Sequence, residues 1–412
     1  MNCLVKYKLH LFGFALAMFC SCSNILLAGG KTVSTGEAAA NTSMQAAYTV
    51  DYITQNTADQ IHRYYAKRHK LDGFNGCVMV ARNGEPIYTG AFGYENYSQK
   101  DTLTTQSSFQ LASVTKTFTS TAILQLIEQG KVSLDDTLQK FFPEFPYRDI
   151  TVKLLLSHRS GLPDYIYWTS DFIGKNTDKL TNQSLLDLLI AKKPPVRCKP
   201  DRVFVYCNTN YALLACVIEK VSGTSYKQYM HDNIFAPLGM TSTFVCTIED
   251  TAEHCGAACY EARRWKEWQW AFSDGVVGDK GIYSSVEDML KWDNALKSGQ
   301  IVSGEMLQEA YTPHSLDRYS FAKDRSRNYG LGWRLIKQPG GSTLVYHNGN
   351  WHGCNNVFAR DLKEGYTIIV LGNKANEANY MTQPVWNIIA QMKSGLNVAA
   401  TLQESPREST EE

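Results

Sequence analysis

The chain has 412 residues, of which 44% are hydrophobic and 20% are charged, as in an ordinary globular protein. Its 41 basic and 40 acidic residues leave a formal net charge of +1, which argues against the basic surface of a nucleic-acid-binding protein. After the N-terminal region, no segment reaches the roughly 18 consecutive apolar residues of a transmembrane helix.

The first 28 residues are typical of a secretory signal peptide. Lys6 and Lys8 precede the apolar run LHLFGFALAMF, which is too short to cross a bilayer and is followed by small residues. Cys22, between two serines, fits a bacterial lipoprotein signal that ends before this cysteine, and plain cleavage within LLAGG (26–30) is an equal alternative. Both alternatives predict a protein exported from a bacterial cell, either periplasmic or anchored to the membrane through a lipidated Cys22. Residues 29–47 are small and polar and are predicted to form a spacer.

Residues 48–396 are predicted to form the catalytic domain, and residues 397–412 a disordered tail. Within this domain, apolar spacing predicts a helix near 50–69, and two β-prone runs flank Asn83-Gly84, a strong hairpin signal. An apolar helix follows at Ser113, and the chain then reads as mostly helical to about residue 235. Further helices are predicted at 285–299 and 385–393, and short strands at 342–349, 354–361 and 365–373. Strands at both ends can therefore close one sheet around an inserted helical lobe, with a cleft between them.

Eight cysteines follow the signal region, and they allow 105 pairings among which the sequence does not choose. Buried thiols with one or two disulfides are expected, because a chain of this size does not need many covalent links. The stretch HCGAAC (254–259) has no second ligand pair at zinc-like spacing, so no metal site and no cofactor are predicted. Trp265, Trp268 and Trp270 are expected to serve packing.

The segment SVTK places Ser113 three residues before Lys116, at the start of the apolar helix. A hydroxyl and an ammonium at this spacing share one helix face, so the lysine could take the proton of the serine. No Gly-x-Ser-x-Gly turn and no His-Glu-x-x-His pattern is present. A histidine-assisted triad stays open, because its members come together only on folding.

Two further stretches accompany the serine in a fixed order, Tyr206-Cys207-Asn208 before an amphipathic helix and His347-Asn348-Gly349 on a late strand. With LLLSHRSGLPDY (154–165) and GDKGIYSSVEDMLKWDNAL (278–296), they make the chain resemble a family of penicillin-recognising serine enzymes over residues 55–392. This family comprises class C β-lactamases, D-alanyl-D-alanine carboxypeptidases, D-aminopeptidases and family VIII esterases. The resemblance implies an α/β, β-lactamase/transpeptidase-like fold, with a five-stranded antiparallel sheet flanked by helices and an inserted helical lobe.

The resemblance also implies roles for individual residues. Ser113 would attack a carbonyl and form an acyl-enzyme, with its own backbone N–H and that of Asn350 holding the oxyanion. Lys116 and Tyr206 are the candidate bases, and as an interacting pair they are expected to titrate as a unit. The residues expected to contact the substrate are Asn208, His347, Gly349 and Trp351.

One departure from the family bears on the substrate. Efficient β-lactamases of this family have Lys-Thr-Gly where this chain has His347-Asn348-Gly349, and histidine is mostly neutral at neutral pH. We therefore expect a serine hydrolase or acyltransferase for an ester, an amide or a D-amino-acid peptide, such as a peptidoglycan-derived one, with weak activity on β-lactams at best. The alternatives are a penicillin-binding sensor that stays acylated and a pseudoenzyme that only binds. Turnover separates an enzyme from a sensor, and a pseudoenzyme predicts no labelling of Ser113. The oligomeric state stays open.

Overall fold

The computed structural model describes residues 35–172, 179–250, 255–314, 326–338, 341–375 and 382–404, with side chains from residue 51 to residue 395. The predicted signal peptide, 1–28, lies outside the described residues. Two compact units are present: residues 1–51 with 398–412, and residues 52–397, which contain the sheet and the site described below. No helix among the described residues is long and apolar enough to span a membrane.

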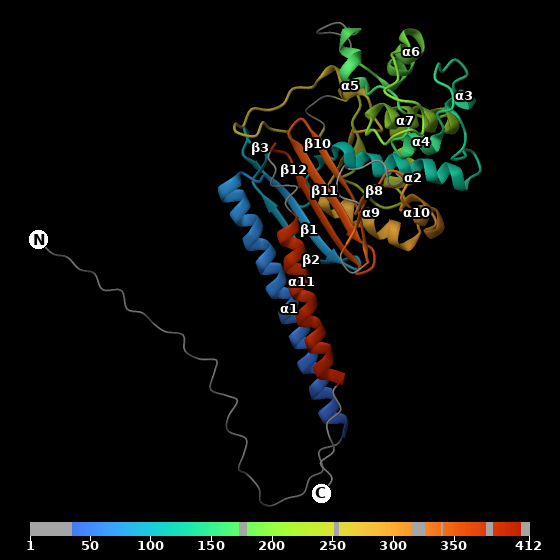
Figure 1. Cartoon of the computed structure of the whole chain (residues 1–412). Helices are drawn as coiled ribbons and strands as arrows, with labels where there is room; N and C mark the ends of the chain where they lie inside the picture. The colour runs from blue at the N-terminus through green and yellow to red at the C-terminus, as the bar shows by residue number, and fades with distance from the viewer. Residues whose placement is uncertain are drawn as a thin grey trace, which may run out of the picture. The chain divides into compact units, whose positions relative to one another are not determined.

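The helices and strands follow one another along the chain as shown in Figure 1. The strands are β1 (Gly76–Arg82), β2 (Glu85–Phe92), β3 (Tyr94–Asn96), β4 (Asp101–Thr102), β5 (Phe109–Gln110), β6 (Phe244–Val245), β7 (Ile282–Ser284), β8 (Arg327–Tyr329), β9 (Arg334–Lys337), β10 (Thr343–Trp351), β11 (Cys354–Asp361) and β12 (Tyr366–Gly372). The α-helices are α1 (Thr35–Asp72), α2 (Thr115–Glu128), α3 (Leu138–Phe141), α4 (Val152–Leu156), α5 (Tyr165–Trp168), α6 (Asn182–Lys192), α7 (Asn208–Ser222), α8 (Tyr226–Met230), α9 (Val286–Ser298), α10 (Gly304–Ala310) and α11 (Gln383–Glu404). Short turns of other helix types are η1 (Ala112–Val114), η2 (Thr169–Asp171), η3 (His231–Phe235) and η5 (Phe272–Gly275).

The main sheet joins the two ends of the catalytic domain. Its described strands lie in the order β2-β1-β12-β11-β10-β9-β8, and every neighbouring pair is antiparallel. The hairpin predicted at Asn83-Gly84 connects β1 and β2, and Asn83 adopts the positive φ of 50° that such a turn requires. The predicted fold class is confirmed, but the sheet has seven strands instead of the expected five. The two additional strands, β8 and β9, have three and four residues, too few to show an alternating pattern in the sequence.

Both faces of the sheet are covered, and the side chains of β1 alternate between two cores. Cys77, Met79 and Ala81 belong to the core that contains α2, α7 and α9, whereas Val78 and Val80 belong to the core formed with α1 and α11. Within residues 52–397, Figure 1 shows α1 and α11 side by side on this face of the sheet, where Ile61, Tyr65, Val385 and Ile389 share one core. The active-site cleft lies on the side of α2 and α7, where the helical lobe from α3 to α8 is inserted.

Helices α1 and α11 extend past the limits of the predicted catalytic domain, 48–396. Residues 35–47, predicted as a polar spacer, are part of α1, and residues 397–404, predicted as tail, are part of α11. Both segments are rich in alanine and in long unbranched side chains, which have high helix propensity.

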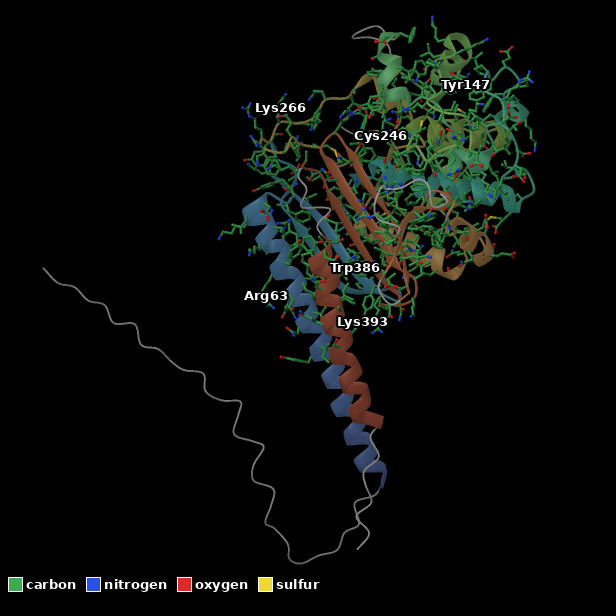
Figure 2. All side chains as sticks on the ribbon, in the orientation of Figure 1. Arg63, Tyr147, Cys246, Lys266, Trp386 and Lys393 are labelled. Carbon is green, nitrogen blue, oxygen red and sulfur yellow. A yellow bond between two sulfur atoms is a disulfide. The ribbon has the colours of Figure 1, made fainter. Side chains whose placement is uncertain are left out.

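The cysteines pair as two disulfides, Cys246–Cys255 and Cys259–Cys354. Cys77, Cys198, Cys207 and Cys216 are not disulfide-bonded, and three of these four are buried. The expectation of one or two disulfides beside buried thiols is confirmed. The first disulfide can be located by the Cys246 label in Figure 2.

Candidate active site

Ser113 lies in the short turn η1, directly before α2, as the sequence predicts. The preceding residue, Ala112, has a φ of 48°, an uncommon value for a residue with a side chain and one that concentrates at functional sites. Gly349 of β10 packs against this turn, since a Cβ atom at position 349 would lie 2.1 Å from the carbonyl oxygen of Leu111. The turn that presents the serine is therefore held directly against the sheet.

Lys116 lies one helical turn after Ser113 and is fully buried. Its Nζ is 3.0 Å from Ser113 Oγ, 2.9 Å from Asn208 Oδ1 and 2.8 Å from the carbonyl oxygen of Asp279. The last two groups can only accept hydrogen bonds, so they occupy two N–H groups of the lysine. The remaining position on the nitrogen, an N–H in the ammonium or a lone pair in the neutral amine, faces the serine hydroxyl.

Asp164 fixes the orientation of Asn208 at the start of α7. Its Oδ2 accepts hydrogen bonds from both the backbone N–H and Nδ2 of Asn208, each at 3.0 Å. Because Nδ2 is engaged in this way, Oδ1 of Asn208 must point at Lys116. Burial raises the pKa of Asp164, and the backbone N–H groups of Asn208 and Ile166 oppose this shift. Asp164 also lines the cleft, and the sequence analysis does not single it out.

Tyr206 lies beside the catalytic pair and lines the cleft. The Lys116 Nζ is 5.1 Å from the centre of its ring. No hydrogen bond between the Tyr206 hydroxyl and Ser113 or Lys116 occurs among the described residues. The ring is packed between His158, with ring centres 4.3 Å apart, and the guanidinium of Arg334, 5.1 Å from the ring centre.

His347 does not line the cleft, contrary to its expected contact with the substrate. Its side chain is completely buried, with Nε2 3.0 Å from the Tyr329 hydroxyl and Nδ1 2.7 Å from the carbonyl oxygen of Asn348. Burial, together with the charges of Arg334 and Lys116, lowers the pKa of His347 well below its usual value. This histidine is therefore neutral. It lies on the same face of β10 as Val345 and Gly349, toward α2, but Tyr206 and Tyr329 pack against it and separate it from the cleft.

Three cations that the sequence analysis does not single out line the cleft instead, Arg197, Lys280 and Arg334. The cleft has a volume of about 480 Å³. It is lined by Ala112, Ser113, Asp164, Ile166, Tyr167, Arg197, Tyr206, Asn208, Asp279, Lys280, Arg334, Asn348, Asn350 and Trp351. Arg334 belongs to β9, one of the strands missing from the predicted sheet, so no motif in the sequence placed it at the site.

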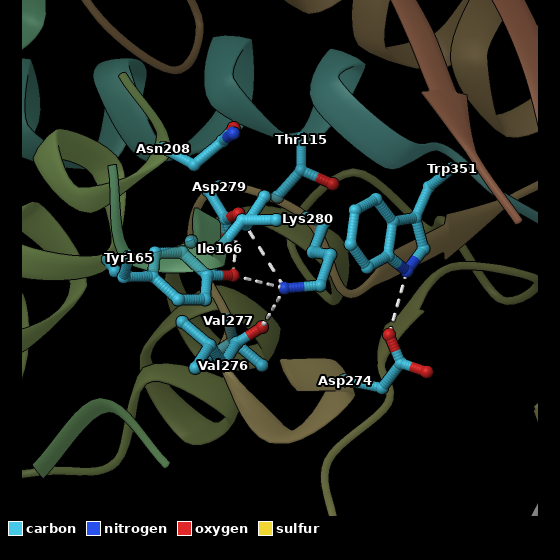
Figure 3. Close-up of polar contacts among 12 residues, drawn as sticks. Thr115, Tyr165, Ile166, Asn208, Asp274, Val276, Val277, Asp279, Lys280 and Trp351 are labelled. Carbon is cyan, nitrogen blue, oxygen red and sulfur yellow. Dashed lines mark hydrogen bonds and ion pairs between the residues drawn. The ribbon is translucent and has the colours of Figure 1, made fainter. Parts of the chain in front are cut away.

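Lys280 is almost completely buried in the wall of the cleft, as Figure 3 shows. Its Nζ donates to the Tyr165 hydroxyl and, at 3.3 Å, to the carbonyl oxygen of Val276, and it lies 3.6 Å from Asp279 Oδ2. The same ammonium is 5.0 Å from the centre of the Trp351 ring. Lys280 is buried in the wall, whereas Arg197 is exposed and Arg334 is partly exposed beside the Tyr206 ring.

The other expected site residues are distributed along β10. Asn350 and Trp351 line the cleft, and β9 pairs with β10 only as far as Tyr346, so the part of β10 that faces the site carries no strand on that side. Gly349 is not among the residues that line the cleft. Among the described residues, no group of three or more His, Cys, Asp or Glu side chains has the geometry of a metal site.

Comparisons with known proteins agree with this architecture. The family model described as Beta-lactamase matches residues 59–391. Penicillin-binding protein 4* of Bacillus subtilis (strain 168) is 31% identical over 340 residues, which cover 79% of this chain and 74% of that protein.

Two solved structures have the same fold at 25% sequence identity. The octameric penicillin-binding protein homologue from Pyrococcus abyssi has a TM-score of 0.68 and covers 85% of this chain and 78% of its own. The D-amino acid amidase from Ochrobactrum anthropi SV3, solved with L-phenylalanine amide, has a TM-score of 0.65 and covers 85% of this chain and 99% of its own.

Proposed function

The chain belongs to the beta-lactamase family and is a serine hydrolase, and we propose that it cleaves an ester or amide of a small D-amino-acid derivative or peptide through an acyl-enzyme on Ser113. The observation that carries this proposal is the contact of Lys116 Nζ with Ser113 Oγ at 3.0 Å inside the cleft.

The contacts of Lys116 support a route for the proton of the serine. When the amine is neutral, its two N–H groups serve Asn208 Oδ1 and the Asp279 carbonyl, and its lone pair faces the Ser113 hydroxyl. Oγ can then form a bond to the substrate carbonyl carbon while its proton passes to Nζ. The Tyr206 hydroxyl would give its proton to the leaving group and then take one from the Lys116 ammonium, so that the serine proton reaches the leaving group and both residues regain their starting state.

The developing oxyanion would be held by backbone N–H groups of Ser113 and Asn350. The position of Ser113 just before the 14-residue helix α2 supports this role, since the N-terminus of a helix carries partial positive charge. Asn350 pairs with Asn355 of β11, and it lies on the part of β10 that lines the cleft and that β9 does not reach. Asn208 and the Trp351 ring would bind the portion of the substrate next to the scissile bond.

The charges of the cleft favour a substrate with a carboxylate. Arg334 supplies a permanent positive charge beside Tyr206. His347, which is buried and neutral, supplies no charge there. A guanidinium can bind a carboxylate through two parallel hydrogen bonds. We therefore favour a D-amino-acid peptide with a free C-terminal carboxylate, and we expect β-lactams to react slowly.

The acceptor of the acyl group is water in a hydrolase and an alcohol or amine in an acyltransferase. A sensor that stays acylated is the second candidate, and the name of the related Penicillin-binding protein 4* favours testing it. We also propose that the protein is exported, with the cleft facing peptidoglycan-derived peptides, either as a periplasmic protein or attached to the membrane through Cys22.

Intact-mass labelling with three classes of compound tests the proposal. The panel contains p-nitrophenyl esters, D-Ala-D-Ala peptides and penicillins, and each reaction is followed for both adduct and product. We expect many product molecules per protein with an ester or a peptide. A single adduct that does not turn over identifies a sensor, and the absence of any adduct or product contradicts the acyl-enzyme.

A further inference from the structure

A second pocket lies beside the cleft and is not used by the proposed reaction. It has a volume of about 350 Å³, and no lysine or arginine is among the described residues that line it. Its side chains are mainly acidic, aromatic or amide. The acidic and aromatic members are Glu95, Asp101, Glu267, Asp274, Trp268, Trp270 and Tyr283.

Four carboxylates line the pocket, of which two are exposed, one is partly exposed and one is buried. Glu267 and Asp101 are exposed and form no ion pair within the described part of the chain. Asp274 is buried, and burial alone would raise its pKa. The neighbouring His352 and the more distant Lys280 outweigh this effect and lower the pKa of Asp274 below its usual value. The pocket is therefore negative at neutral pH.

A buried amide in the wall of the pocket points to a missing partner. Gln110 is 8% exposed, and its Nε2 donates to the Tyr283 hydroxyl at 3.2 Å. Its Oε1 has no hydrogen-bond partner among the described residues. A buried acceptor without a partner is costly, so a donor from a ligand or a water molecule is expected there.

The second pocket lies next to the cleft at the end of β10. Asn350 and Trp351 line the cleft, and the next residue, His352, lines the second pocket. Between them, Trp351 Nε1 donates to Asp274 Oδ1 at 2.7 Å, as Figure 3 shows. A substrate that extends from Ser113 past Asn350 and Trp351 would point toward the second pocket.

Both disulfides hold the wall of this pocket. Cys255 and Cys259 line it, and they are bonded to Cys246 and Cys354. Cys354 is the first residue of β11, so the wall is tied covalently to the sheet. A wall fixed in this way is organised before binding, which reduces the entropy cost of holding a ligand.

We infer that the second pocket binds an alkylammonium group at the far end of the acyl portion of the substrate, an inference that rests on the proposed function. Carboxylates attract such a cation, and the exposed face of Trp268 can add a cation–π contact. The amide oxygen of Gln110 would accept a hydrogen bond from a primary ammonium. The pocket thus determines which acyl groups are preferred, whereas Ser113 and Lys116 carry the reaction.

A pair of isosteric esters tests the charge preference directly. The p-nitrophenyl esters of 6-(trimethylammonio)hexanoate and 7,7-dimethyloctanoate have the same shape and differ only in the branched atom, which is N⁺ in the first and carbon in the second. Both esters are also made with chains of about four to eight carbons, so that one of them matches the distance along β10 from Ser113 to the second pocket. We expect kcat/KM for the cationic ester to exceed that of the neutral one by about tenfold at the best length. Glu267→Gln and Asp101→Asn should each reduce this ratio about two- to fivefold, the size of one partly exposed ion pair.

Glu305→Gln is the matched control, because Glu305 is exposed on α10 and lines neither pocket. It removes the same charge and should leave the ratio unchanged. A ratio near one at every length, or a ratio that falls equally in Glu305→Gln, overturns the inference while leaving the proposed hydrolase intact.

Binding without turnover separates the two proposals. Isothermal titration of Ser113→Ala protein with the N-methylamides of the same two acids should show binding of the cationic amide only, weakened by Glu267→Gln. If wild-type protein hydrolyses no ester but the cationic amide still binds in this way, the proposed function fails and the ammonium site stands. Equal binding of both amides, or binding of neither, refutes the ammonium site.

Discussion

Gly349 and Leu111 are in such close contact that a Cβ atom on Gly349 would lie 2.1 Å from the carbonyl oxygen of Leu111. Leu111 directly precedes the turn that carries Ser113, and Gly349 lies on β10 opposite Asn356 of β11. Asn356 Nδ2 in turn donates to the carbonyl oxygen of Gln110 at 2.8 Å. The absence of a side chain at position 349 therefore sets the distance between the nucleophile and the sheet.

Gly349→Ala should consequently reduce acylation of Ser113 without unfolding the protein. The added methyl group must push the turn away from β10, and a displacement of this order can cost about 100-fold in rate. The measurement is kcat/KM on a neutral p-nitrophenyl ester, together with the urea midpoint. Gly304→Ala is the control, because a Cβ atom there meets nothing within 4 Å. Full activity of Gly349→Ala would show that the close contact has no catalytic consequence.

Lys116→Ala and Tyr206→Phe should each lower the acylation rate by about 100-fold or more, the usual size of general acid–base catalysis. If the two residues share one proton, the double variant should be hardly slower than the slower single variant. Pre-steady-state acylation of all four proteins measures this coupling. Losses that multiply would mean that lysine and tyrosine act independently.

Arg334→Gln should lower activity on a substrate with a carboxylate more than activity on a neutral ester. A single charge-assisted contact in a partly exposed site is worth about 1–2 kcal/mol, which corresponds to a change of about 5- to 30-fold in the ratio of the two kcat/KM values. Arg148→Gln, at an exposed position that does not line the cleft, should leave this ratio unchanged. If Arg334→Gln changes this ratio no more than Arg148→Gln does, Arg334 is not the carboxylate site.

The buried histidines should make the protein less stable in mild acid. Burial, followed by the charges of Lys116, His347 and Arg334, lowers the pKa of His158 well below its usual value, and His347 is lowered in the same direction. In mild acid the unfolded chain therefore binds more protons than the folded chain. As a result, the free energy of unfolding falls as the pH drops below about 6.5.

Each of these two histidines should remove about 1 kcal/mol between about pH 7 and pH 5.5. Urea unfolding at the two pH values measures the loss. His347→Gln should reduce the pH dependence, whereas His231→Gln, at an exposed position, should not. If His347→Gln leaves the pH dependence unchanged, His347 binds a proton equally well in the folded and unfolded chain. That result would contradict its lowered pKa.

Much of the fold was predictable because its longest elements carry strong local signals. The Asn83-Gly84 turn marks the first hairpin, and the apolar runs of β10, β11 and β12 show the remaining core strands. The strands β8 and β9 could not be found in this way. They exist because β10 offers an edge for pairing, and this is a property of the assembled sheet.

The same limit explains which site residues were found. Ser113, Lys116, Tyr206 and Asn208 lie in short motifs with a fixed spacing, so the sequence alone brings them to notice. Arg334 lies on an unpredicted strand and has no motif. His347 lies on the expected face of β10, but it is buried by Tyr206 and Tyr329, and their packing against it is a property of the folded chain that the motif does not reveal.

The most direct test of the account is the site of covalent attachment. Wild-type protein is treated with a fluorophosphonate and with an activated ester, and the modified peptide is identified by mass spectrometry. The account predicts a single adduct on Ser113, slowed by Lys116→Ala and absent in Ser113→Ala. An adduct on another residue, with Ser113→Ala still fully active, would contradict it.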